Sequence, residues 1–268
     1  APTATNTNAA GNAPVAGSAK IDGANRTTNI NGDITILKQT ASNKSGFSIT
    51  TYTGTGTAGD RIDHGLARAP TFWIIKKYQT AAASTNSWIV GHKMMTGYVV
   101  LDNTNMQVLP ATGAWNGEAT PSTDTFIHLG NGTGVNTAGE SYIMYAWTDI
   151  QGVTATGGYI AGNNAPMAIG SSCNPLAMLM FGITGSTAVS KVLVDKVNKP
   201  VGGVTSFAGT VLHPDLPDAA TAVPQVEFRG NGSQIMNTNQ TNGYNEDDTT
   251  YGYIQWGDQF GQFTNGQG

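Results

Sequence analysis

The chain has 268 residues, a formal net charge of −4 at pH 7 and only 11% charged residues. An average soluble domain has about 25% charged residues, and a slightly acidic chain with scattered basic residues does not attract nucleic acid. Its apolar runs are far shorter than the roughly 20 residues that a membrane-spanning helix requires. We therefore expect neither nucleic acid nor a membrane as a partner.

The residue types favour strands and turns over helices. Glycine accounts for 35 residues, Thr and Asn are abundant, and there are only four Glu and ten Leu. Long unbranched side chains suit helix surfaces because they lose little rotamer freedom there. Thr suits a pleated surface, and Gly and Asn suit tight turns. The composition therefore predicts an all-β protein.

Residues 1–45 are expected to form an extended N-terminal arm. The first 20 consist almost only of Ala, Thr, Asn, Gly and Pro, and such a segment buries too little apolar area to offset the entropy of ordering it. We expect a neighbouring subunit to hold the arm, with packing against its own domain as the alternative. Residues 30–37 alternate like a short strand and form the expected attachment point.

The rest of the chain carries an internal repeat, which predicts two domains at residues 46–150 and 151–268. Five landmarks recur in order at an offset of 105–109 positions: Tyr52 and Tyr159, Pro70 and Pro175, Asn136 and Asn245, Tyr142 and Tyr251, and Trp147 and Trp256. Each proline leads into an apolar strand candidate, where it does not break the ladder. Short strands between glycine turns are typical of two tandem β-sandwich, jelly-roll-like domains.

The sequence nominates no catalytic or cofactor-binding residue. Asp60, Asp63 and His64 lie close together and would suit a metal or acid–base site, but a polar turn before Pro70 is the preferred interpretation. Cys173 is the only cysteine, and we expect a buried structural thiol. The glycine-rich stretches match neither a nucleophile elbow nor a phosphate-binding loop. We therefore predict that the protein is not an enzyme.

An acidic turn in the second copy is the one weak candidate for a metal site. Glu246, Asp247 and Asp248 are adjacent, and their carboxylates repel one another unless they are solvated or neutralised by a hard cation such as Ca²⁺. A solvated loop is the preferred interpretation, and a structural Ca²⁺ ion is the alternative.

Two aromatic residues have no equivalent in the other copy. The recurring Tyr and Trp residues are expected in the core, whereas Trp115 and Tyr244 do not recur. Because aromatic faces stack on sugars, Trp115 and Tyr244 are the candidates for contact with glycans at the surface.

Several strings in the first copy resemble a known family. They are FSITTYTGTG at 47–56, HGL at 64–66, FWIIKK at 72–77 after Pro70, GAWN at 113–116 and VNTAG at 135–139. The pattern resembles a duplicated β-domain of unassigned function in structural proteins of tailed phages, especially marine ones. The resemblance covers residues 46–150 well and 157–256 more weakly. It implies a component of the virion surface and transfers no catalytic residue.

From this resemblance we expect a virion structural protein, a head decoration or cement protein or an outward-facing appendage, assembled through its N-terminal arm. Its expected partners are other copies of itself and other virion proteins, with host surface glycans as further ligands. The alternatives are a tail-fibre, receptor-binding or lectin-like module and, third, a glycan-degrading enzyme. No secretory leader pattern is visible at the start, so we expect the virion surface as location, after synthesis in the host cytoplasm.

Overall fold

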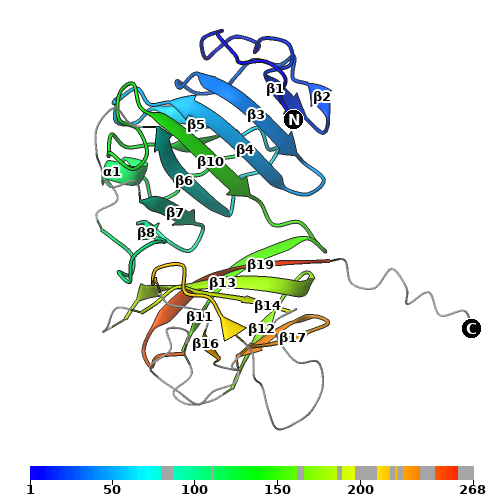
Figure 1. Cartoon of the computed structure of the whole chain (residues 1–268), viewed down its shortest axis with the longest axis vertical. Coiled ribbons are helices and arrows are strands. Elements are labelled where there is room, and N and C mark those ends of the chain that lie inside the picture. Colours follow the sequence, from blue (N-terminus) through cyan, green and yellow to red (C-terminus); the bar gives the residue numbers. More distant parts are fainter. Residues whose placement is uncertain are drawn as a thin grey trace, which may run out of the picture. The chain divides into compact units, whose positions relative to one another are not determined.

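The regular secondary structure of the described residues is almost entirely β-strand, which confirms the all-β prediction (Figure 1). The computed structural model describes residues 1–79, 87–109, 112–161, 166–185, 189–196, 210–217, 221–222, 226–235 and 245–258. The chain forms two compact units, the first made of residues 1–101 and 107–148 and the second of residues 102–106 and 149–268. Within the described residues, α1 (Thr112–Trp115) is the one α-helix.

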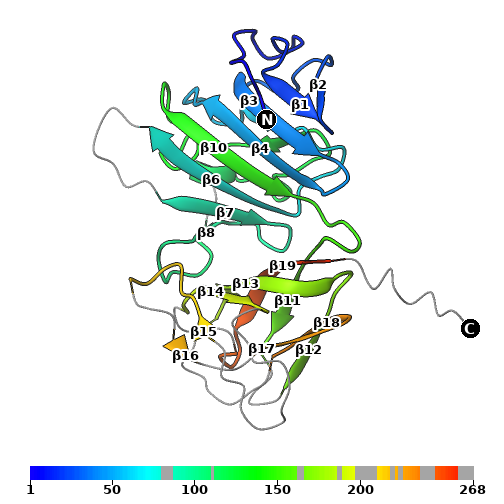
Figure 2. The same cartoon turned by 45° about the vertical axis from the view of Figure 1, so that its right-hand side comes forward.

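An eight-stranded sheet forms the framework of the first unit, in the order β2-β1-β3-β4-β10-β6-β7-β8. Its strands are β1 (Ala19–Ile21), β2 (Ala24–Asn25), β3 (Ile36–Ser42), β4 (Phe47–Thr53), β6 (Phe72–Gln79), β7 (Trp88–His92), β8 (Val99–Val100) and β10 (Ser141–Trp147). Figures 1 and 2 both show β3, β4, β10 and β6 side by side. A separate antiparallel pair joins β5 (Arg61–Asp63) and β9 (Phe126–His128).

The core of the first unit lies against one face of this sheet. Every second residue of β4 and β10 is buried, as expected because successive side chains of a strand point to opposite faces. Tyr52 of β4 and Tyr142 of β10 are directly paired, and their rings stack with centroids 5.2 Å apart. Trp73 of β6 meets Trp115 of α1 edge to face in the same core, at 5.3 Å.

The first 45 residues fold onto the first unit, so the prediction of an extended arm was wrong. Strand β1 pairs in parallel with β3. The buried Asn6 side chain donates a hydrogen bond to Ile36 O at 2.9 Å, and its backbone N–H donates to Leu37 O at 2.8 Å. Asparagine side chains thus replace the apolar area that the segment lacks, which is the alternative of packing against its own domain.

The second unit is built on a four-stranded sheet in the order β11-β19-β13-β14. Its strands are β11 (Thr154–Ile160), β13 (Asn174–Thr184), β14 (Val192–Asp195) and β19 (Thr250–Asp258). A three-stranded sheet contains β12 (Met167–Gly170), β18 (Gly232–Ile235) and β17 (Val226–Arg229), and β15 (Thr210–Val211) pairs with β16 (Thr221–Ala222).

The two units share one strand arrangement, which agrees with the internal repeat. The order β4-β10-β6-β7 in the first unit corresponds to β11-β19-β13-β14 in the second. Tyr159 and Tyr251 are paired and stacked at 5.0 Å, as Tyr52 and Tyr142 are. The antiparallel pair β5–β9 likewise corresponds to the pair β12–β18.

The loop before the last strand is also fastened in the same way in both copies. Thr137 N donates to Tyr142 Oη at 2.9 Å, and Glu246 N donates to Tyr251 Oη at 3.1 Å. In both cases the donor lies five positions before the tyrosine. The recurrent Asn136 is buried, and so is Asn245.

Candidate functional site

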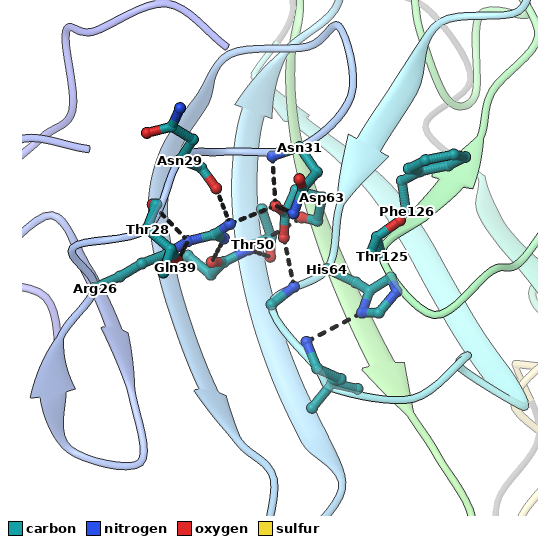
Figure 3. Close-up of polar contacts among 12 residues, drawn as sticks. Arg26, Thr28, Asn29, Asn31, Gln39, Thr50, Asp63, His64, Thr125 and Phe126 are labelled. Carbon is teal, nitrogen blue, oxygen red and sulfur yellow. Dashed lines mark hydrogen bonds and ion pairs between the residues drawn. The ribbon is translucent and has the colours of Figure 1, made fainter. Parts of the chain in front are cut away.

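The polar cluster around Asp63 is a buried ion pair. Asp63 ends β5, and its Oδ2 lies 2.7 Å from Arg26 Nη2, with side-chain exposures of 2% and 4%. Asn31 donates to the same oxygen from its backbone N at 2.7 Å and its Nδ2 at 3.1 Å. Gly65 N donates to Oδ1 at 2.8 Å. The carboxylate therefore accepts four hydrogen bonds and faces a guanidinium (Figure 3).

The guanidinium of Arg26 connects this carboxylate to the main sheet. Its Nη1 donates to Gln39 Oε1 of β3 at 2.9 Å, and its Nη2 also donates to Asn29 O. Gln39 Nε2 in turn donates to Asp63 O at 3.0 Å and to Thr50 Oγ1 of β4 at 3.2 Å. The network joins residues 26–31, the main sheet and the β5 segment.

The electrostatics of the pair favour permanent charges. Burial alone would raise the pKa of Asp63, but the hydrogen bond and charge of Arg26, with the N–H groups of Asn31 and Gly65, lower that pKa below its usual value. A carboxylate in this state is a poor proton acceptor and serves to hold Arg26 in place.

His64 faces away from the ion pair and has its own structural contacts. Its Nδ1 accepts a hydrogen bond from Leu66 N at 3.1 Å, and its Nε2 lies 3.0 Å from Thr123 O. A ring that accepts at Nδ1 carries its proton at Nε2 and donates it to the Thr123 carbonyl. Burial lowers the pKa of His64. The ring is therefore neutral and has no lone pair left for a metal ion.

Asp60 does not join these residues, because its carboxylate accepts a hydrogen bond from Thr55 Oγ1 at 2.5 Å. The structure thus separates three residues that are neighbours in sequence. Among the described residues, no three His, Cys, Asp or Glu side chains gather in a way that could hold a metal ion.

That finding includes the acidic turn of Glu246, Asp247 and Asp248. Glu246 uses its backbone N–H to bond Tyr251, and Thr249 N donates to Glu246 O. Asp248 turns the chain with a φ of 57°. In this described segment the three carboxylates do not form a cation-binding group, so the calcium alternative finds no geometric support.

Cys173 is buried, as expected. Its Sγ lies 3.2 Å from Ser171 Oγ, and burial raises the pKa of the thiol. A raised pKa disfavours the thiolate, which is the reactive form.

The two aromatic candidates for surface contacts fare differently. Tyr244 lies outside the described residues. Trp115 is fully buried, so its prediction as a surface residue was wrong. Its ring packs on Trp73 and its Nε1 donates to Gly97 O at 3.0 Å. The lack of an equivalent of Trp115 in the second copy therefore did not indicate that this residue is exposed.

The first unit contains a cavity lined in part by Gly113 and Ala114, which precede Trp115. Its volume is about 230 Å³, and it is lined by Ser87, Ile89, Tyr98, Val100, Gly113, Ala114, Gly132, Thr133, Gly134 and Val135. These residues come from β7, β8 and the residue before each of them, from α1 and from the glycine-rich loop before β10. Trp115 supports the wall indirectly, because it fixes the carbonyl that precedes Tyr98.

Neither Arg26 nor the cavity was found from the sequence. Arg26 is 37 positions from its partner Asp63, and no spacing rule links residues that far apart. The cavity is lined largely by small and apolar residues, whose types resemble those of ordinary turns and strands. The sequence pointed to this region through GAWN at 113–116, but the predicted ligand contact was Trp115, whereas Gly113 and Ala114 line the cavity.

Among the described residues, no helix is long and apolar enough to cross a membrane. No curated protein and no solved structure gives a significant match to the chain. One family model matches residues 1–259 and so spans both units together with the first 45 residues. The chain therefore belongs to the family described as Domain of unknown function (DUF7483).

Proposed function

We propose that the chain is a non-enzymatic structural protein of a tailed-phage virion, a head decoration protein or an outward-facing appendage. The observation that carries the structural part is the Arg26–Asp63 network. The residues that the sequence offered for chemistry are bonded to each other or to the backbone, and they hold the N-terminal segment on the sheet. The resemblance over residues 46–150 supports the virion setting.

The N-terminal segment is not the element that we propose to join subunits. Because residues 1–45 are part of the first unit, the proposal does not use them as an exchanged arm. Other copies of the chain and other virion proteins remain the proposed partners, with the whole folded unit as the element that they contact.

The experiment follows the chain through particle purification. Particles from a culture that produces the chain are separated on a density gradient, and the chain is quantified by mass spectrometry in each fraction. We expect it to co-sediment with intact particles in a constant ratio to the major head protein. Recovery only in the fraction of free proteins would overturn the proposal.

The cavity of the first unit favours a second candidate, a receptor-binding or lectin-like module. The same cavity offers nothing for a glycan-degrading enzyme among its described lining residues, because none of them has a carboxyl group and glycosidases need a pair of carboxyl groups at the scissile bond.

A further inference from the structure

Hydroxyl groups are the polar side-chain groups of the cavity in the first unit. Ser87, Tyr98 and Thr133 line it, and their hydroxyls have no hydrogen-bond partner among the described residues. None of the described residues of this lining carries a charge. A ligand that fits must therefore be neutral and rich in groups that both donate and accept hydrogen bonds.

The rest of the lining is apolar. Ile89, Val100, Ala114 and Val135 contribute buried hydrocarbon surface, which favours contact with C–H groups. Beside them, Tyr98 provides an aromatic ring with a polar tip. Together with the hydroxyls, this surface matches a molecule whose ring has C–H faces and a polar edge.

Glycines let the loop before β10 pack closely against β7 and α1 at the edge of the cavity. A Cβ on Gly134 would lie 2.7 Å from Ile89 Cγ1, and a Cβ on Gly132 would lie 2.5 Å from Gly113 O. Neither position has room for a side chain. The loop therefore presents bare backbone to the cavity, so that a ligand can approach the peptide groups closely.

The wall that carries Tyr98 is held from two sides. Gly97 O accepts the Trp115 Nε1 proton, and Gly97 N donates to Gln107 Oε1 at 3.1 Å. Tyr98 N and O also exchange hydrogen bonds with Val108. A ring on a fixed backbone is pre-organised, which lowers the entropy cost of binding.

We propose that this cavity binds one neutral, polyhydroxylated ring, that is, a single sugar residue of a glycan. The cavity of about 230 Å³ is smaller than the roughly 300–1,000 Å³ of sites for drug-sized ligands, which suits one ring. Tyr98 stacks on the C–H face of the sugar, and Ser87 and Thr133 bond its hydroxyls. The proposal goes beyond the virion role, because a sugar site is compatible with any location of the protein.

The test is a titration of the full chain with single neutral sugars. Methyl glycosides of glucose, galactose, mannose, fucose and N-acetylglucosamine are added at millimolar concentrations, with sialic acid as a charged comparison, and binding is followed by ligand-observed NMR. Four variants are compared with the wild type: Tyr98→Ala, Tyr98→Phe, Thr133→Val and Ser87→Ala. Near-ultraviolet circular dichroism verifies that each variant is folded.

Two matched controls lie outside the cavity. Tyr78→Ala removes a tyrosine of β6 that is 52% exposed, and Thr40→Val removes a half-buried hydroxyl of β3. Both make the same chemical change as a cavity variant without touching its lining.

We expect at least one neutral sugar to bind, Tyr98→Ala to weaken binding at least tenfold, and Tyr98→Phe to retain most of it. Loss of one hydroxyl in Thr133→Val or Ser87→Ala is expected to weaken binding about two- to tenfold. The controls are expected to bind like the wild type. The proposal is overturned if no neutral sugar binds, if sialic acid is preferred, or if the controls weaken binding as much as the cavity variants.

Discussion

Two Arg–Asp pairs of the first unit have the same separation and opposite surroundings. Arg26–Asp63 and Arg61–Asp33 both have N–O distances of 2.7 Å. The side chains of the first pair are 4% and 2% exposed, whereas those of the second are 39% and 40% exposed. The two pairs share their residue types and their shortest N–O distance, and they differ most in burial.

Arg26→Met is expected to destabilise the protein by about 3–5 kcal/mol, because it leaves a buried carboxylate without its counter-ion. Arg61→Met is expected to cost roughly 0.2–1 kcal/mol, because water solvates Asp33 when its partner is lost. Denaturant unfolding of both variants measures the difference. Equal effects of the two substitutions would contradict the role assigned to the buried network.

His64 makes the first unit sensitive to mild acid. Because burial lowers its pKa in the folded protein, the unfolded chain binds the proton first, at a pH of about 6.5. The contribution of His64 to stability is therefore complete above about pH 6.5 and is lost as the pH falls below that value.

We expect the free energy of unfolding to decrease as the pH falls below about 6.5, and His64→Gln to remove that part of the dependence. His128→Gln on β9 is the control. An NMR titration of the ring protons measures the pKa directly, and a value for His64 above 6.5 would be incompatible with the prediction.

Lys191 is the corresponding buried charge of the second unit. It is fully buried beside β14, and its Nζ donates to Asn105 O at 2.6 Å. Burial lowers its pKa to about 8, although Asp215 and Asp102 act in the opposite direction. Between about pH 8 and 10.4, the unfolded chain thus holds a proton that the folded chain has released.

Stability is expected to rise with pH in this range, because the unfolded state binds more protons there. Lys191→Met is expected to abolish the rise. The quantity to measure is the difference in unfolding free energy between wild type and variant from pH 7.5 to 10. The titration of Cys and Tyr residues contributes equally to both proteins and cancels in this difference. A difference that is independent of pH would refute the assignment.

At the scale of the elements, a tyrosine hydroxyl fastens each loop to the last strand of its copy. Tyr142→Phe leaves Thr137 N and Thr133 O without their partner and is expected to cost about 1–3 kcal/mol. Tyr251→Phe, which frees Glu246 N, is expected to cost about 1 kcal/mol.

The control is Tyr145→Phe, on the other face of β10, with an expected change within about 0.5 kcal/mol. Thermal unfolding of the three variants gives the comparison. If Tyr142→Phe were as mild as Tyr145→Phe, the loop bond would have no energetic role.

The strands themselves were easier to predict than their contacts. The apolar run after Pro70 located β6, because that pattern is local. Pro175 was also placed near a strand start, and it lies in β13 where the register with β19 shifts. Pairing order is not local, so the insertion of β10 between β4 and β6 could not be derived from the repeat alone.

Contacts between segments that are distant in the sequence were predicted least well. The apolar content of residues 1–20 predicts disorder, but that criterion leaves out the hydrogen bonds by which Asn6 holds the segment to β3. Burial of Trp115 was missed because its partners Trp73 and Gly97 lie on other segments. Such contacts depend on the tertiary structure and leave no periodic signal.

At the scale of the whole molecule, the two units are not consecutive pieces of chain. Residues 102–106 lie within the first copy in sequence but belong to the second unit. Met106 packs against the second core, and Asn105 O binds Lys191. The predicted boundary at 150 and 151 therefore differs from the structural division by this short segment.

Met106→Ala is expected to destabilise the second unit by about 1–2 kcal/mol, less than a fully buried methionine would cost because the side chain is partly exposed. Hydrogen exchange should become faster in β13, β14 and β19 and stay unchanged in β4 and β10. Met144→Ala, in the core of the first unit, should give the reverse pattern. Faster exchange in β4 alone for Met106→Ala would contradict the division.

The position of β10 and β19 has a consequence for synthesis on the ribosome. Each is the last described strand of its copy, yet each lies between two earlier strands in its sheet. While a copy is being translated, β4 and β6, or β11 and β13, have no shared neighbour to pair with. The parts of each sheet that flank this strand cannot join until it leaves the exit tunnel, so each sheet is completed late in the synthesis of its copy.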